Sequence, residues 1–456
     1  MRVLLVACNS CREPYPVYPL GMAVLAAALE AAGRRVAQYD LLAEGWDLDA
    51  LRGRVRDFDP QCVGLSVRNL DNVDSLSAGR GWFADQAREA VRAVRAATAA
   101  PVVVGGAGFS LMPDLVLDHL GADYGIAGEG EEAFPALLAT LEQGGTPPRI
   151  SGGGKPCGPG AAMPPARFIP DYVRFYQGES GLMGVQTKRG CPNACAYCAY
   201  PLIEGRTVRC RDPREVAGEL VRLRREHGVD TVFFTDAVFN DAGGRYLELA
   251  EELARNPAGV RWLAYFQPRG MDRRTLRLLR RSGLMGLEVG ADAASDATLA
   301  GLGKGFSFAQ VADFNALCVS EGLPCAHFVI FGGPGETPDT VEEGLRNLDR
   351  LDPAVVFAFS GIRVHPRTRL HELALAQGVL RPDADLLRPV FYHAPGLDPE
   401  ALNARLAQAF ARRRDRIFPP ERGYERMAVL HRLGFRGVLW DTLIRLPAPA
   451  AAGAPS

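Results

Sequence analysis

Three cysteines stand close together near the middle of the chain, in the segment Thr187-Lys-Arg-Gly-Cys-Pro-Asn-Ala-Cys-Ala-Tyr-Cys198. Cys191, Cys195 and Cys198 are separated by three and then by two residues. Three thiolates at this spacing can hold three irons of a four-iron, four-sulfur cluster and leave the fourth iron without a protein ligand. The spacing therefore predicts a metal centre with one open position, where a small molecule can bind.

A structural zinc site is the first alternative for these cysteines. Such a site normally closes with four ligands, supplied as two cysteine pairs or with histidines at short spacing. No histidine stands at that spacing, and Cys210, a fourth candidate ligand, lies well beyond the segment after a charged run. A disulfide framework is a weaker alternative, because ten cysteines in 456 residues are sparse. The open cluster is the favoured interpretation.

Composition narrows the class of protein. The net charge of -1 gives no electrostatic argument for nucleic-acid binding. No apolar run approaches the roughly 18 residues that span a bilayer, and too few residues precede Cys8 for a lipoprotein signal. We therefore expect a soluble cytoplasmic protein without a membrane span, in which thiols stay reduced. Arginine greatly outnumbers lysine, which occurs only as Lys155, Lys188 and Lys304.

The elements around the cysteine segment alternate between strands and helices. Between residues 182 and 385 the helical patterns separate six apolar runs that are predicted as strands. Six successive units predict a partial (β/α)6 barrel of the TIM type, with chemistry at the carboxyl ends of its strands. The cysteine segment follows the first strand, at the mouth of the barrel. The predicted strands are 184–187, 231–235, 260–266, 286–289, 326–331 and 355–359.

Residues 1–145 show the same alternation on their own. Apolar runs at 2–7, 62–66 and 101–104, with an amphipathic helix at 20–32, predict an α/β domain with a doubly wound parallel sheet of the Rossmann-like kind. Glycine-rich turns begin at Gly105 and Gly128, after strands, where such sheets bind ligands. The alternative is that these glycine-rich turns are only tight connections between elements and bind no ligand.

Three further segments complete the organisation of the chain. Residues 146–181 are rich in glycine and proline and are predicted to be a linker. Residues 386–446 form a predicted C-terminal helical region, whose aromatic residues either shape a pocket over the barrel or belong to its core. Residues 447–456 have too little apolar bulk to pack and are predicted to be disordered.

With the cysteine segment placed after the first barrel strand, residues 1–385 resemble the radical S-adenosylmethionine enzymes that carry a cobalamin-binding domain, a group similar to the class B radical methyltransferases. Tyr197, before the third cysteine, is part of the resemblance. The resemblance implies that Cys191, Cys195 and Cys198 hold a 4Fe-4S cluster, whose open iron binds S-adenosylmethionine. One electron, from an external reductant of the flavodoxin or ferredoxin type, would cleave that molecule to a 5′-deoxyadenosyl radical. The resemblance also implies cobalamin as a cofactor.

The resemblance assigns S-adenosylmethionine contacts to polar residues at strand ends. Asp236 stands where relatives hold the methionine amino group, although a helix cap is the alternative. Glu288 resembles the acidic residue that accepts hydrogen bonds from the ribose hydroxyls. Arg269 is placed to reach the methionine carboxylate.

The turn after the fifth strand resembles the adenine-binding turn of the family. It contributes Ile330, Gly332 and Gly333, while a plain turn before a helix is the alternative. His327, within the fifth strand, faces either the barrel interior or the surrounding core, and alternation alone does not decide this.

The N-terminal turns resemble those of cobalamin domains, with one departure. The loop after the first strand contains no histidine to serve as the lower axial ligand of cobalt. Arg68 or Asn69 could then lie beneath the cobalt, where a cation disfavours a fifth ligand and stabilises the low-valent state; a surface arginine is the alternative. The candidate cobalamin contacts are Tyr18, Leu20, Ser66, Arg68, Asn69, Gly105, Gly106, Gly108, Gly128, Glu129 and Gly130.

Three functions follow from these observations. The first is a cobalamin-dependent radical methyltransferase acting on an unactivated carbon of a small natural-product or lipid-like substrate. The second keeps both cofactors but performs a rearrangement, cyclisation or ring contraction. The third is a non-catalytic iron-sulfur electron-transfer protein. The sequence motifs do not separate the first two, because their first steps are shared.

Overall fold

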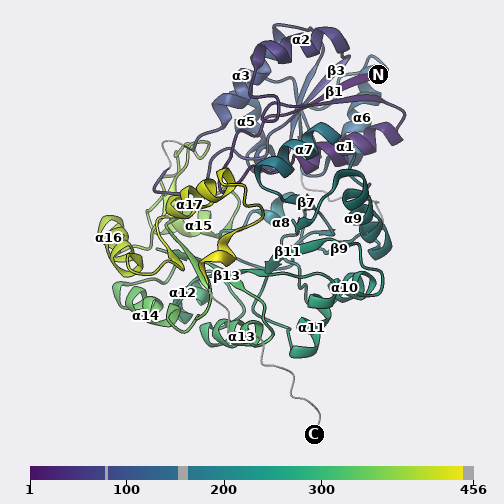
Figure 1. Cartoon of the computed structure of the whole chain (residues 1–456). Helices are drawn as coiled ribbons and strands as arrows, with labels where there is room; N and C mark the ends of the chain where they lie inside the picture. The colour runs from purple at the N-terminus through teal and green to yellow at the C-terminus, as the bar shows by residue number, and fades with distance from the viewer. Residues whose placement is uncertain (78–80, 153–162, 445–456) are drawn as a thin grey trace.

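Runs of valine and leucine build an N-terminal sheet that is parallel throughout (Figure 1). Its strand order is β2-β1-β3-β4-β5-β6. The chain adds strands toward one edge of the sheet up to β2 and toward the opposite edge from β3 onward, so the order switches between β1 and β3. Alternate residues of its strands join apolar clusters with helices on the two faces, as the predicted doubly wound sheet requires. The strands are β1 (Arg2–Ala7), β2 (Arg35–Asp40), β3 (Cys62–Ser66), β4 (Val102–Gly105), β5 (Tyr124–Ala127) and β6 (Ile150–Gly152), and the helices are α1 (Leu20–Ala31), α2 (Leu48–Phe58), α3 (Ala84–Arg95), α4 (Ala107–Leu111), α5 (Pro113–Leu120) and α6 (Gly130–Glu142).

The second sheet is also parallel and has the order β17-β14-β13-β12-β11-β10-β7. The six predicted barrel strands follow one another in this order, each separated by helices, so the partial barrel is confirmed; β17 (Arg416–Ile417) adds an unpredicted strand beside β14. The other strands are β7 (Met183–Val185), β10 (Thr231–Phe234), β11 (Arg261–Phe266), β12 (Leu287–Asp292), β13 (Cys325–Phe331) and β14 (Val355–Ser360), and the helices between them are α9 (Pro213–His227), α10 (Tyr246–Arg255), α11 (Arg273–Arg281), α12 (Asp296–Gly301), α13 (Phe308–Ser320) and α14 (Pro338–Leu348).

The computed structural model describes residues 1–77, 81–152 and 163–444. The central part of the predicted linker and the predicted disordered tail, 447–456, lie outside these ranges. Within the linker, α7 (Pro170–Glu179) packs on the N-terminal domain, because Tyr176 donates a hydrogen bond to Asp40 Oδ2 at 2.7 Å. None of the helices in the described ranges is both long and apolar enough to cross a bilayer.

The C-terminal region returns to the barrel. After β14 come β15 (Ile362–Arg363), α15 (Arg369–Ala376), β16 (Phe391–Tyr392), α16 (Pro399–Phe410), β17, α17 (Glu421–Arg432) and the 3-10 helix η1 (Trp440–Leu443). Figure 1 shows α17, in yellow, next to the N-terminal domain. The helix η1 packs against β13 and β14, so the last described segment of the chain contributes to the barrel interior.

Alternation along the strands divides the barrel residues between an inner and an outer apolar cluster. On β13, Ala326 and Phe328 join the inner cluster with Trp440, while Cys325 joins the outer one. His327 faces outward: it is fully buried, its Nε2 lies 3.0 Å from Asn315 Oδ1 on α13, and burial lowers its pKa to about 3. His327 is therefore a core residue.

Candidate active site

The cysteine loop lies at the mouth of the barrel between two short strands, β8 (Lys188–Arg189) and β9 (Arg209–Cys210), and includes α8 (Tyr200–Ile203). Neighbouring backbone fixes its course: Ala196 N–H donates to Leu302 C=O at 2.8 Å, and Cys191 N–H donates to Gly205 C=O at 3.1 Å. Burial and the other two thiols raise the pKa of Cys198 to about 12. The three thiols therefore lie within electrostatic range of one another.

This arrangement fits a cluster. No three of the described His, Cys, Asp and Glu side chains converge tightly enough to hold a single metal ion. A four-iron cluster needs a wider spacing, because each thiolate binds a different iron. Lys304 supplies a positive charge beside Cys195. Burial lowers the pKa of its ammonium group, but the negative charges of Asp292 and Cys195 outweigh burial and raise that pKa above its usual value. An ammonium group there compensates the negative charge of bound thiolates.

Asp292 also lies beside the cysteine loop and Lys304, although the sequence did not point to it. Tyr197 donates a hydrogen bond to Asp292 Oδ2 at 2.5 Å, and Lys304 forms an ion pair with the same carboxylate. The register of β12 shifts between Val289 and Asp292, and Asp292 has a φ of 63°. This irregularity brings Asp292 together with the cysteine loop. The predicted residue Tyr197 is thus held beside the thiols by a carboxylate and an ammonium group.

Asp236 fixes the start of the cysteine loop. Its fully buried carboxylate accepts hydrogen bonds from the backbone N–H groups of Thr187 at 2.7 Å and Lys188 at 3.1 Å, and also from the Thr187 hydroxyl. Lys188 in turn pairs with Asp241 at 2.6 Å. Asp236 therefore makes its contacts with the backbone next to the cluster cysteines, and its role toward the methionine amino group stays a prediction.

The other predicted S-adenosylmethionine residues lie at strand ends around the same mouth. The guanidinium of Arg269 donates to Gly305 C=O at 3.1 Å, next to Lys304. The backbone N–H groups of Gly332 and Gly333 both donate to Glu336, at 3.1 Å from Gly333, which closes the turn after β13. Ile330 is partly buried two residues before that turn. Contacts of these residues with S-adenosylmethionine stay predictions.

A cavity of about 610 Å³ lies between the N-terminal sheet and the barrel. Its first wall consists of the carboxyl ends of β1, β3, β4 and β5, at the point where the strand order reverses. This is where open α/β sheets bind ligands. Asn69 and Gly108 do not line the cavity, whereas the remaining cobalamin candidates do: Tyr18, Leu20, Ser66, Arg68, Gly105, Gly106, Gly128, Glu129 and Gly130.

Two glycines of this wall pack closely against neighbouring parts of the protein. Gly106 has a φ of 102°, and a Cβ atom there would lie 2.6 Å from the Val67 carbonyl oxygen. A Cβ atom at Gly64 would lie 2.8 Å from the ring of Phe134. Any side chain at these positions would displace the turn or the helix that it meets, so the wall keeps its shape only with glycine there. Contacts of this backbone with cobalamin stay a prediction.

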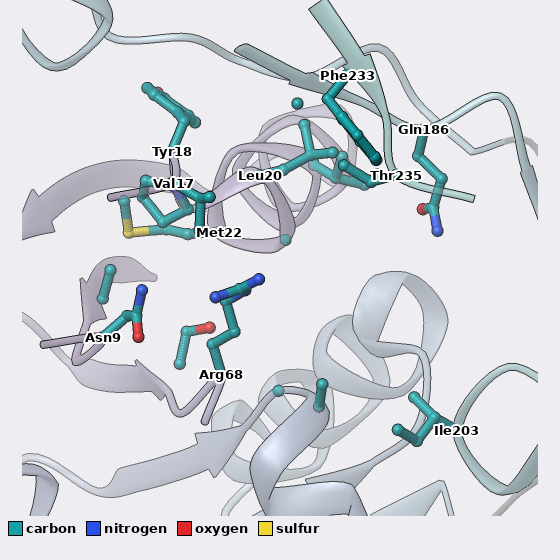
Figure 2. Close-up of a pocket in the computed structure, with 18 of the residues that line it drawn as sticks. Asn9, Val17, Tyr18, Leu20, Met22, Arg68, Gln186, Ile203, Phe233 and Thr235 are labelled. Carbon is teal, nitrogen blue, oxygen red and sulfur yellow. The ribbon is translucent and has the colours of Figure 1, made fainter. Parts of the chain in front are cut away.

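Arg68 reaches into the middle of the cavity, between Asn9 and Ile203 (Figure 2). The described residues give its guanidinium no hydrogen bond or ion pair. Burial raises the pKa values of the Tyr15 and Tyr265 phenols, and the charge of Arg68 opposes that rise in both. Arg68 is thus a cation available to a ligand in the cavity, and its position beneath cobalt stays a prediction.

Ion pairs tie the cysteine loop to the N-terminal domain. Arg189, on β8, pairs with Glu131 at 2.6 Å, and Arg209, on β9, pairs with Glu129. All four side chains are largely buried. Glu129, a predicted cofactor contact, therefore also holds the two halves of the molecule together.

The far end of the cavity lies inside the barrel and is walled by aromatic residues. Glu288 is 5% exposed there, and Trp440 Nε1–H donates a hydrogen bond to its Oε1 at 3.2 Å. Burial raises the pKa of Glu288 to about 7. Sequence reasoning identified Glu288 but not its surroundings, since Tyr15, Tyr265 and Trp440 come from distant parts of the chain.

Comparisons with known proteins agree with this geometry. The family model for the B12 binding domain matches residues 13–138, and that for the radical SAM superfamily matches residues 185–348. Tryptophan 2-C-methyltransferase of Streptomyces laurentii is 28% identical over 77% of this chain and 71% of its own length. Cytidylyl-2-hydroxyethylphosphonate methyltransferase of Streptomyces wedmorensis is 26% identical over 90% of this chain and 89% of its own. The structure of the radical S-adenosylmethionine methyltransferase TsrM from Kitasatospora setae, with cobalamin and a 4Fe-4S cluster bound, superimposes with a TM-score of 0.83 at 25% identity, covering 97% of each chain.

Proposed function

Because the chain belongs to the radical S-adenosylmethionine enzymes that carry a cobalamin-binding domain, we propose that it methylates a carbon atom of a small, flat and largely apolar natural-product-like molecule. It is a cobalamin-dependent radical S-adenosylmethionine methyltransferase.

The continuous cavity carries this proposal. One wall belongs to the B12 binding domain, and the opposite wall belongs to the barrel strands. Tyr200 and Ile203, on α8 within the cysteine loop, line it as well. A substrate inside the barrel would therefore face both cofactor sites from a single position. Methyl transfer from cobalamin to the substrate requires this arrangement.

The residues of this chain have three tasks in that reaction. Cys191, Cys195 and Cys198 would hold the cluster, and the turns at Gly105 and Gly128 would hold cobalamin. When bound, the cluster supplies an electron to S-adenosylmethionine and cobalamin carries the methyl group. The apolar barrel wall excludes water from the reacting atoms, which protects reactive species.

The lining of the barrel end favours one substrate class over another. The two curated relatives described above act, by their names, on tryptophan and on a cytidylyl phosphonate. An anionic phosphonate calls for cationic partners, whereas the barrel end presents aromatic rings and the carboxylate of Glu288. We therefore assign the substrate to the aromatic class that carries an N–H group.

The test uses anaerobically purified enzyme, loaded with cluster and cobalamin and supplied with a one-electron reductant. Indole compounds, including tryptophan, are offered together with S-adenosylmethionine that carries a deuterated methyl group. The expected product has gained one deuterated methyl group in place of hydrogen. A skeleton of unchanged or dehydrogenated mass would instead establish a rearrangement or cyclisation. Absence of a methylated product from every indole compound would overturn the proposed substrate class.

A further inference from the structure

The inner pocket is the part of the cavity that lies deepest in the barrel. Two aromatic pairs form its sides: the rings of Phe328 and Phe357 are stacked with centroids 5.2 Å apart, and those of Phe233 and Tyr265 meet edge to face at 4.9 Å. Trp440 closes its floor. We define the inner pocket by Phe233, Tyr265, Glu288, Phe328, Phe357 and Trp440.

Glu288 is the carboxylate of this pocket and has unused hydrogen-bonding capacity. A carboxylate offers about four acceptor positions, and among the described residues only Trp440 donates to it. None of the described arginines or lysines forms an ion pair with it. Burying a carboxylate without a partner is costly. A structural role alone gives no reason for an acid at this position.

Two other buried acids show what a structural role looks like in this protein. Glu336 is 3% exposed, but it accepts hydrogen bonds from both N–H groups of its own turn. Glu321 is 5% exposed and pairs with Arg273 at 2.7 Å and Arg277 at 3.0 Å. Each is satisfied by the protein, and neither lines the cavity. Glu288 differs from them in both respects.

Position along β12 separates Glu288 from the cluster. Asp292, four residues further along the strand, contacts Tyr197 in the cysteine loop. At about 3.3 Å per residue, Glu288 lies roughly 13 Å from that end of the strand. The geometry therefore favours contact of Glu288 with the substrate in the inner pocket over contact with a molecule bound at the cluster.

We propose that Glu288 is a specificity-determining residue: it accepts a hydrogen bond from an N–H group of a flat aromatic substrate, whose ring lies between the two aromatic pairs. This assignment rests on the proposed methyltransferase function and names the group by which the substrate is recognised. Trp440 is the positioning residue, because its indole N–H orients the carboxylate. The same carboxylate repels anionic groups from the pocket.

The experiment measures binding with two probes of equal shape. Indole carries the N–H donor, and benzofuran replaces it with an oxygen atom. Calorimetry with the anaerobic holoenzyme above pH 7, where the Glu288 carboxyl group with its pKa of about 7 is mostly ionised, is expected to show indole binding about tenfold more tightly than benzofuran, as for one hydrogen bond to a charged acceptor. Glu288→Leu and the isosteric Glu288→Gln are both expected to lose most of this preference. Glu321→Gln, a change at an equally buried acid outside the cavity, is the matched control and keeps it.

Each result decides between roles. Retention of the preference for indole in Glu288→Leu, with the absorption spectrum of bound cobalamin unchanged, would overturn the assignment. Weaker S-adenosylmethionine binding with an unchanged indole preference would assign Glu288 to the ribose instead. Loss of the preference in a protein that methylates no indole would leave Glu288 as the recognition residue and overturn the proposed function. Equal binding of both probes by the unmodified holoenzyme would also overturn the assignment.

Discussion

The strand β12 carries a buried acid at each end, and the two acids are treated differently. Asp292, at the cysteine loop, is neutralised by Lys304 and receives a hydrogen bond from Tyr197. Glu288, at the inner pocket, receives only the indole N–H of Trp440 among the described residues. At the cofactor end of the strand, the protein itself supplies the ion pair and the hydrogen bond that stabilise the buried carboxylate. At the substrate end, the Glu288 carboxylate keeps free acceptor positions for a hydrogen-bond donor of the ligand.

The largest effect is expected from removing a cluster ligand. Cys195→Ala should abolish deoxyadenosine formation and methyl transfer, because the cluster loses one of its three ligands. The inner pocket lies apart from the loop, so the preference for indole over benzofuran should persist, and cobalamin should remain bound. Iron content, deoxyadenosine yield and the cobalamin absorption spectrum measure these outcomes. Persistent deoxyadenosine formation would refute the cluster assignment.

The next largest effect is expected from breaking the ion pair between Asp292 and Lys304 at the cofactor end of β12. Asp292→Asn leaves the buried ammonium group of Lys304 without its ion pair, a change that costs about 3–5 kcal/mol at buried sites. We expect a lower thermal midpoint and less iron per chain. Lys304→Met combined with Asp292→Asn should recover part of the loss, because no unpaired charge remains. If the single variant were as stable as the unmodified protein, the two acids of β12 would not differ as described.

The pH dependence of stability should distinguish Glu288. Its pKa is raised by burial from 4.5 to about 7, so the folded protein holds a proton that the unfolded chain has lost between these values. Stability therefore falls as the pH rises through this window, by about 3 kcal/mol. Glu288→Gln removes this loss, so the variant should match the unmodified protein below pH 4.5 and exceed it above pH 7. Thermal midpoints measured across the window provide the test.

The phenols that face Glu288, Tyr15 and Tyr265, have raised pKa values and stay neutral in this window. Glu336 has a similar pKa, but it is present in both proteins, so it cancels in the comparison. Equal pH profiles for the two proteins would show that Glu288 already has a partner that neutralises it.

The smallest effect concerns the floor of the inner pocket. Trp440→Phe keeps an aromatic ring but removes the N–H that orients Glu288. We expect a loss of about 1 kcal/mol in stability and a weaker preference for indole, with S-adenosylmethionine binding unchanged. A variant that binds indole as selectively as the unmodified enzyme would show that Glu288 needs no orienting partner.

Sequence patterns predicted the cofactor end well because its information is local. The three cysteines and Tyr197 occupy one short segment, and the strand before them is recognisable from its apolar run. Glycine turns after β4 and β5 were likewise visible as composition. Parallel pairing then brings such strand ends to one edge, so the neighbourhood of these residues follows from the fold class.

The inner pocket could not be predicted in the same way. Glu288 and Trp440 are 152 residues apart, and no periodic pattern relates them. Asp292 escaped notice because the predicted strand ended at residue 289, whereas β12 runs on to Asp292. Glu288, which was predicted at the carboxyl end of the strand, therefore lies near its start, and a shift in register precedes Asp292 at the cysteine loop. One signal was available: lysine is rare in this chain, and Lys188 and Lys304 both lie buried beside that loop.

The floor of the inner pocket has an evolutionary consequence. Trp440 and Val438 lie beyond both segments that match the family models, which end at residue 348. Mutations in this last part of the chain can therefore reshape the floor without touching the cluster ligands or the glycine turns. A lineage that keeps its cofactor chemistry can acquire new substrates by diversifying its C-terminus, and the separation of the two ends of β12 is what permits this.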